Sequence, residues 1–295
     1  MNDLRTILAI ADPDGEGSDL ALQRAVDIAR ASGARILWFG FAHTERLDAS
    51  LVKPAVMETL RNALLDQKRA RMQQALDGID TLGVDIDLEV MWEKHLASRV
   101  SEQVMERDVD LVIKTGRRSE TWLYTPSDWQ LLRECPAPVM IVASRSWRKR
   151  GRLLVAVDLG AESSAEQEFR ELLMADAAGL AATLGLELHC AYSIEVPTVA
   201  ADLDLIDRDW YAERVRQKIQ PTVEQLAERF DLPLERFHFR TGKPGRTLPS
   251  IADQLKADLV VLGTLGRKGI RGKLMGNTAE DVLTRLRTDI LAIKP

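Results

Sequence analysis

The residues of this sequence with the clearest chemical potential are the glycines near its C-terminal end. Three of them, Gly263, Gly266 and Gly276, are spaced as Gly-x2-Gly-x9-Gly. Glycine lets backbone N–H groups approach a phosphate closely, and a helix that starts near Asn277 would add free amide donors and partial positive charge. The same segment carries four cations, at Arg267, Lys268, Arg271 and Lys273. These residue types predict a loop that binds the phosphates of a nucleotide.

An acidic residue completes the expected site. Asp158 ends an apolar run that begins at Leu153, and such a run is typical of a buried strand. Ligands of an open parallel sheet bind at the edge where the strands end, so Asp158 is placed to accept a hydrogen bond from a ribose hydroxyl or a base amino group. Two plainer interpretations stay open: the glycine segment is only a mobile connection, and Asp158 only caps the following helix.

Two familiar phosphate-binding motifs are excluded by their spacing. In a P-loop, a glycine stands five residues before a Gly-Lys-Ser/Thr triplet. Here Gly272-Lys273 is followed by Leu274, and Arg267 occupies the position of the first glycine. A dinucleotide fingerprint should follow the first strand, but neither Asp12 nor Asp158 is close to a G-x-G-x-x-G pattern. The chemistry of those two architectures is therefore not expected.

The elements that must position these residues occur twice along the chain. The run from Ile7 to Asp12 returns from Leu153 to Asp158, and each copy is followed by a polar stretch and an amphipathic helix that should end at a glycine. Because strands and helices alternate throughout, each half is expected to form a parallel sheet with helices on both faces, an α/β fold. The basic segment 145–151 is the composition break between the halves. It predicts domains over residues 1–144 and 152–295 joined by a linker.

Composition excludes several classes of protein. The 295 residues are 45% hydrophobic and 29% charged, as in globular proteins, and no apolar run is long enough to span a membrane. The net charge of −5 is spread over both halves, which argues against a dedicated DNA-binding domain. Cys135 and Cys190 are too few for a disulfide framework, and the histidines show no metal-ligand spacing. We expect a cytoplasmic protein with no DNA partner, no membrane insertion and no metal site.

The Gly263, Gly266, Gly276 spacing resembles the nucleotide-binding signature of the universal stress protein (Usp) family, in its tandem two-domain, UspE-like form. The resemblance implies two Rossmann-like domains of the adenine-nucleotide α-hydrolase type, each a five-stranded parallel sheet in the order 3-2-1-4-5. It also implies an internal pseudo-dimer that pairs through the last strands, and it leaves a homodimer open. By the same resemblance, Asp158 and Ala191 contact adenine or ribose, the glycines contact phosphate, and the expected ligand is ATP with magnesium.

Two departures from the family pattern matter for ligand binding. Asn277 occupies the position that is usually Ser or Thr, and Thr278 follows it. An amide can still donate to phosphate, so we keep both residues in the candidate site. The first half departs further because Thr125-Pro126 replaces the final glycine pair, and Pro126 has no N–H to donate. We predict that the first half does not bind ATP.

The residues show no catalytic set, because no Ser-His-Asp order, paired-carboxylate motif or metal site stands out. The function we expect is a non-enzymatic stress-response module that binds ATP or another adenine nucleotide through its second half. The alternative is a protein that binds a small apolar or lipid-like metabolite, through the degenerate first half and the long helices, and keeps a vestigial nucleotide loop. A weak ATPase is the third interpretation.

Overall fold

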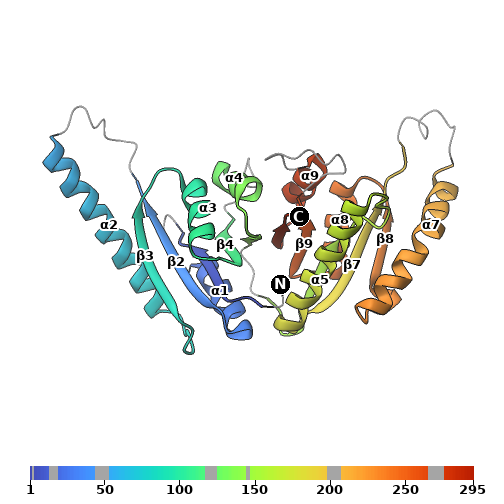
Figure 1. The fold of residues 1–295 in the computed structure, drawn as a ribbon, viewed down its shortest axis with the longest axis horizontal. Helices are drawn as coiled ribbons and strands as arrows, with labels where there is room; N and C mark the ends of the chain where they lie inside the picture. The colour runs from blue at the N-terminus through green and yellow to red at the C-terminus, as the bar shows by residue number, and fades with distance from the viewer. Residues whose placement is uncertain are drawn as a thin grey trace. The chain divides into compact units, whose positions relative to one another are not determined.

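The computed structural model describes residues 1, 3–12, 19–43, 53–116, 125–143, 147–197, 207–264 and 276–295. The chain divides into two compact units (Figure 1). The N-terminal unit spans residues 3–144, and the C-terminal unit spans residues 145–295 together with residues 1–2. Among the described residues, no helix has both the length and the apolar character needed to cross a membrane.

The N-terminal unit is a parallel sheet with the order β3-β2-β1-β4-β5. Its strands are β1 (Thr6–Ile10), β2 (Arg35–Ala42), β3 (Ile86–Trp92), β4 (Leu111–Thr115) and β5 (Val139–Val142). Its helices are α1 (Leu20–Ser32), α2 (Pro54–Asp77), α3 (Leu96–Glu106) and α4 (Pro126–Glu134). The central strand β1 is fully buried between its neighbours, as its continuous apolar sequence predicts.

The C-terminal unit repeats this arrangement, with the order β10-β9-β6-β7-β8. Its strands are β6 (Arg152–Ala156), β7 (Glu187–Ile194), β8 (Phe237–Thr241), β9 (Leu259–Gly263) and β10 (Asp289–Ile293). Its helices are α5 (Ser164–Leu184), α7 (Arg208–Arg229), the 3-10 turn η2 (Leu234–Arg236), α8 (Pro244–Leu255) and α9 (Asn277–Arg285). Counted within each unit, both sheets have the order 3-2-1-4-5, so the expected fold class is confirmed.

Local signals in the sequence explain where the first helix of each unit begins and ends. Asp19 caps α1 by accepting a hydrogen bond from the Leu22 amide, and Ser163 caps α5 through a reciprocal capping box with Glu166. Both helices end at a left-handed glycine, Gly33 with φ 77° and Gly185 with φ 64°. These glycines stop each helix so that the chain can turn into the second strand of its unit.

The described part of the predicted linker is attached to the C-terminal unit. The Trp147 indole N–H donates to Asp289 at 2.8 Å, and the Arg148 guanidinium Nε donates to the Asp258 carboxylate at 3.1 Å. The same carboxylate accepts the Arg152 amide at 3.0 Å. Two buried aspartates, Asp289 and Asp258, therefore hold the segment that leads into β6.

Candidate functional site

The candidate site lies at the carboxyl edge of the C-terminal sheet, where β6 and β9 are neighbours. In this parallel pair Ala156 is opposite Leu262, so Asp158 and Thr264, each two residues further along, emerge at the same edge. Gly276 returns the chain to this edge and starts α9. The structure therefore brings Asp158 and both ends of the glycine segment together, as the position of ligand sites in open parallel sheets predicts.

Thr264 fixes both ends of the glycine segment. The side chain is buried, and its amide donates to the Ile293 carbonyl at 3.0 Å. Its own carbonyl accepts the Gly276 amide, also at 3.0 Å. Sequence reasoning missed this residue, because a threonine next to a glycine carries no signal of its own. Two residues of the predicted site, Gly266 and Arg267, lie outside the described residues.

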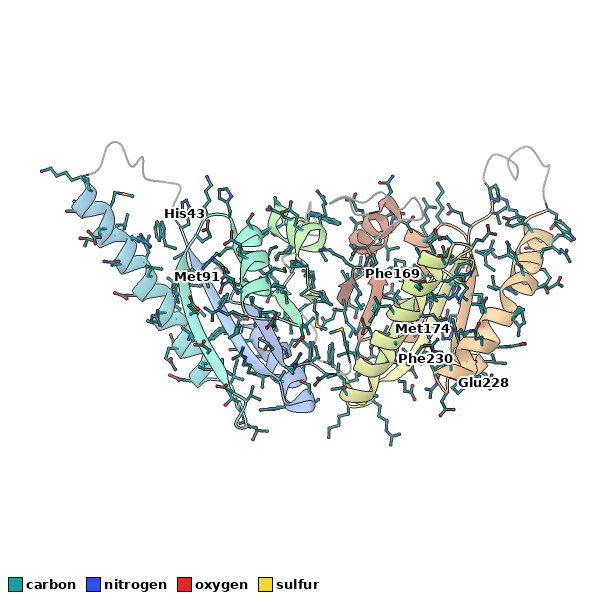
Figure 2. All side chains as sticks on the ribbon, in the orientation of Figure 1. His43, Met91, Phe169, Met174, Glu228 and Phe230 are labelled. Atoms are coloured by element: carbon teal, nitrogen blue, oxygen red, sulfur yellow. The ribbon has the colours of Figure 1, made fainter. Side chains whose placement is uncertain are left out.

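Gly263 lies close to the ring of Phe169. A Cβ atom at this position would lie 2.5 Å from Cε1 and 2.9 Å from Cζ of Phe169, a residue of α5 that is labelled in Figure 2. The N-terminal unit has Thr115 at the equivalent strand end, and its hydroxyl accepts the Ala21 amide at 3.2 Å. The strand geometry therefore tolerates a side chain, and a side chain at position 263 would require the half-buried Phe169 ring to move.

The start of α9 is the part of the site best suited to an anion. Gly276 is the N-cap residue, with extended backbone at φ −65° and ψ 139°, and as a glycine it has no side chain with which to cap the helix. The first-turn amides of a helix have no partner within the helix, so they are available to a ligand. Asn277 and Thr278 are exposed beside them, and both side chains can donate hydrogen bonds to a phosphate.

Asp158 does not cap the following helix, because Ser163 holds that position. Its carboxylate accepts the Gly160 amide at 3.1 Å and so shapes the turn after β6. Tyr192 lies against the same turn, since a Cβ on Gly160 would be 2.8 Å from its hydroxyl oxygen. Further along the turn, Glu162 forms an ion pair of 2.6 Å with Lys218 of α7, and this hydrogen bond raises the pKa of the Lys218 ammonium group.

Ala191 lies inside β7 rather than at its end. It is fully buried, and its register partners are Ala156 on β6 and His238 on β8. Its carbonyl accepts the Val157 amide at 3.1 Å. The position that reaches the turn after β6 is the next residue, Tyr192. The role of Ala191 toward a ligand stays a prediction.

At the equivalent edge of the N-terminal unit, the unit's own polar groups contact one another. Asp12 corresponds to Asp158, and its amide donates to the Asp19 carboxylate at 2.8 Å. Its carbonyl accepts the ammonium group of the buried Lys68, from α2, at 2.5 Å. Burial raises the pKa of Asp19 although two backbone amides donate to it. The sequence alone could not predict the contact between Lys68 and Asp12, because these residues are distant along the chain.

Sequence reasoning also missed one contact between histidines. The two rings of His189 and His238, on the neighbouring strands β7 and β8, are within hydrogen-bond distance, with Nδ1 and Nε2 3.0 Å apart. Burial, then the charge of His238, lowers the pKa of His189 to about 4. The described residues include no group of three or more His, Cys, Asp or Glu side chains arranged to hold a metal ion.

Two tandem doubly wound α/β units, the second with a glycine N-cap at a helix start on its carboxyl edge, define the class of protein. The sequence pattern of the universal stress protein family matches residues 4–143 and 149–294, so the match covers both units. The chain belongs to the universal stress protein family.

Full-length relatives support this membership. Universal stress protein E of Escherichia coli (strain K12) is 31% identical over 99% of this chain and 94% of its own length. The homologue from Haemophilus influenzae is 30% identical over 99% of this chain and 97% of its own. A putative universal stress protein from Pseudomonas aeruginosa UCBPP-PA14 has the same tandem fold, with a TM-score of 0.72, 25% identity, and coverage of 99% of this chain and 94% of that one.

Proposed function

We propose that this protein is a non-enzymatic stress-response binding module, located in the cytoplasm, whose C-terminal unit binds ATP or another adenine nucleotide. The observation that carries the proposal is the start of α9, which has a glycine as its N-cap residue and lies at the same sheet edge as Asp158. Such a helix start supplies amide donors and partial positive charge, the combination that favours a phosphate.

The site residues divide into two groups by their place at the edge. Asp158 and Ala191 are assigned to the ribose and base. Those assigned to the phosphates are Gly263, Gly266, Arg267, Gly276, Asn277 and Thr278. We expect ATP to bind with magnesium, which neutralises part of the triphosphate charge. No step of ATP hydrolysis is proposed.

Calorimetric titration of the full chain with ATP and magnesium tests the proposal. The expected stoichiometry is one ATP per chain, and Gly276→Val should abolish binding because its side chain would enter the phosphate path. The extended backbone of Gly276 accepts any L residue, so this variant should fold. Gly78→Val makes the same chemical change at the end of α2, at φ −84°, and should leave the affinity unchanged.

A second function has a shallow, open groove of the C-terminal unit as its candidate site, whereas the sequence placed this function in the degenerate first half and the long helices. The groove has a volume of about 410 Å³ and is lined by Ala175, Ala178, Gly179, Ala182, Thr183 and Phe230, an almost wholly apolar set. Phe230, labelled in Figure 2, directly follows the long helix α7. A small apolar or lipid-like metabolite is the ligand that this lining would accept.

Native mass spectrometry of the freshly purified chain separates the two functions. A co-purified apolar mass without ATP binding would support the second function and make the glycine segment vestigial. The same spectra give the oligomeric state and so test for a homodimer. Pairing of the two units through their last strands stays a prediction, which cross-linking of the full chain can test.

A further inference from the structure

Two histidines connect the edge strand of the C-terminal sheet to its neighbour. Strand β8 is five residues long and stands last in the order β10-β9-β6-β7-β8, beside β7 (Figure 1). His238 of β8 is the register partner of Ala191, so His189, two residues earlier in β7, lies on the same face of the sheet. The facing nitrogens, His189 Nδ1 and His238 Nε2, are 3.0 Å apart. A hydrogen bond between them requires that one nitrogen carries a proton and the other does not.

The two rings differ in their access to water. His189 is 8% exposed and lies in β7, which has β6 on one side and β8 on the other. Within the described part of the chain, its second nitrogen, Nε2, is buried and makes no hydrogen bond. His238 lies in the edge strand and is half-buried. If the pair separates, His238 can therefore reach water by an outward movement of β8, whereas His189 stays in an inner strand.

The charged groups beside the pair are mostly cations. Arg152 of β6 donates from Nε to Glu187 Oε2 at 3.3 Å, and an Arg236 nitrogen of η2 lies 3.9 Å from Glu187 Oε1. His189 Nε2 lies 3.8 Å from Oε2 of the same carboxylate. The hydrogen bond from Arg152 is the main cause that lowers the pKa of Glu187, so this carboxylate stays ionised as the pH falls. One carboxylate thus faces two guanidinium groups before either ring is charged.

Helix α8 contacts this region through neutral acceptors. The Leu255 carbonyl accepts a hydrogen bond from Arg152 Nη1 at 2.8 Å. Arg240, on the same face of β8 as His238, donates to the Ser250 hydroxyl at 3.2 Å and to the Gln254 amide oxygen. These acceptors offer no negative charge to a protonated histidine.

Protons reach such a coupled pair in two steps. After the first proton, the charged ring donates to the neutral one, so the hydrogen bond persists. A second proton places N–H groups on both facing nitrogens, which removes the bond and puts two cations side by side. Burial is the main cause that lowers the pKa of both rings, that of His189 to about 4. Both rings are therefore neutral at pH 7, and the second proton binds only in acid.

We propose that His189 and His238 form an acid-sensitive latch, which holds β8 on β7 while at most one ring is charged and releases β8 when both are charged. Release frees the backbone N–H and C=O groups of β7 that face β8, and such groups can pair with another strand. The opening is local to the edge of the C-terminal sheet, so it occurs before the unit unfolds. The latch does not rest on nucleotide binding.

Hydrogen exchange of the full chain between pH 7 and pH 4, corrected for the intrinsic effect of pH on exchange, tests the latch. The pKa of His189 is about 4 in the closed pair and ordinarily 6.5, so β8 should open roughly a hundredfold more often at pH 4 than at pH 7. At pH 4 the β8 amides should exchange faster than those of the central strand β6. Low urea concentrations should accelerate the exchange of β6 but not of β8, because a local opening exposes little surface.

Three variants assign the acid effect to this pair. His189→Leu/His238→Gln has no titratable ring at either position, and Leu37 is the residue at the equivalent register position of the N-terminal unit. Its β8 exchange should change by no more than about threefold over this pH range. His238→Gln alone, at a half-buried position, should show a smaller acid effect than the wild-type chain because only one charge can form. His95→Gln removes an exposed imidazole from the N-terminal unit and should leave the acid effect unchanged.

Three results would overturn the proposal. One is exchange of β8 at pH 4 with the same rate and the same urea dependence as β6, since the acid effect would then be global unfolding. Another is an acid effect in His238→Gln as large as that in the wild-type chain. The third is exchange of β8 in the wild-type chain that does not become faster between pH 7 and pH 4.

Discussion

Replacing Gly263 by alanine separates two explanations for a glycine of the family signature. If the glycine serves packing, the cost of Gly263→Ala comes from the Phe169 ring; if it serves phosphate, the cost appears in nucleotide affinity. The new Cβ would lie 2.5 Å from Cε1 of Phe169. Carbon atoms in contact are ordinarily about 3.5–4.0 Å apart, so the ring has to withdraw by roughly 1 Å.

The expected loss of stability follows from this overlap. Forcing a methyl group into a well-packed core costs about 1–3 kcal/mol, and because Gly263 and Phe169 are only half-buried the expected cost is at the lower end, about 1 kcal/mol. A unit of this size changes its unfolding temperature by roughly 2–4 °C for each kcal/mol. Urea unfolding of the full chain, with amide exchange of β9 and α5 as a local readout, measures the change in free energy and assigns it to the C-terminal unit.

A double-mutant cycle tests the cause. In a Phe169→Ala background the ring is absent, so Gly263→Ala should cost almost nothing, and the coupling free energy should equal most of the single-variant cost. The double variant should also retain nucleotide affinity. Equal costs of Gly263→Ala in the two backgrounds would refute the packing explanation, and a loss of affinity without a loss of stability would assign the glycine to phosphate.

Three other perturbations have expected outcomes. Burial and the charge of His238 hold the pKa of His189 at about 4, below its ordinary 6.5, so the unfolded chain binds this proton at a higher pH than the folded chain does. The free energy of unfolding should therefore fall as the pH drops from 6.5 toward 4. His189→Gln should flatten this part of a plot of urea midpoint against pH, and an unchanged slope would contradict the assignment. Gly245→Val should destabilise the C-terminal unit by about 1–3 kcal/mol in thermal unfolding, because a Cβ there would overlap the Oδ2 and Cγ atoms of Asp281. Asp281→Ala removes both atoms and should relieve much of the cost; no relief would locate the strain elsewhere. Asp258→Ala removes the carboxylate that accepts the Arg148 and Arg152 amides at 3.3 and 3.0 Å. Hydrogen exchange of the amides of residues 147–152 should therefore become faster. Unchanged exchange there would show that other contacts hold the segment.

The sequence was sufficient to predict the fold because the repeat is local. Apolar runs ended by an acid, capping residues and terminal glycines define each strand–helix unit within a few tens of residues, and the family resemblance adds the strand order. Gly33 and Gly185 illustrate this, since each adopts the left-handed conformation that its position after a helix predicts. Each unit repeats these signals, so the two sheets could be predicted with the same reasoning.

The candidate site could be predicted only in part, because its contacts join residues distant in sequence. The spacing of the glycines identifies the start of α9, but it does not show that the Phe169 ring lies where a side chain at position 263 would be. Similarly, Pro126 is visible in the sequence, whereas the buried contact between Lys114 and Asp128 depends on how β4 meets α4. Packing between elements, which sequence spacing does not encode, decides these roles.

Backbone NMR of the amides at the start of α9 tests the central claim most directly. ATP and adenosine share the base and ribose, but only ATP carries phosphates. If the phosphates bind at this helix start, ATP with magnesium should shift the Asn277 and Thr278 amide resonances strongly and adenosine should leave them nearly unchanged. Equal shifts with both ligands, no shifts with either, or shifts confined to α4 would contradict the account.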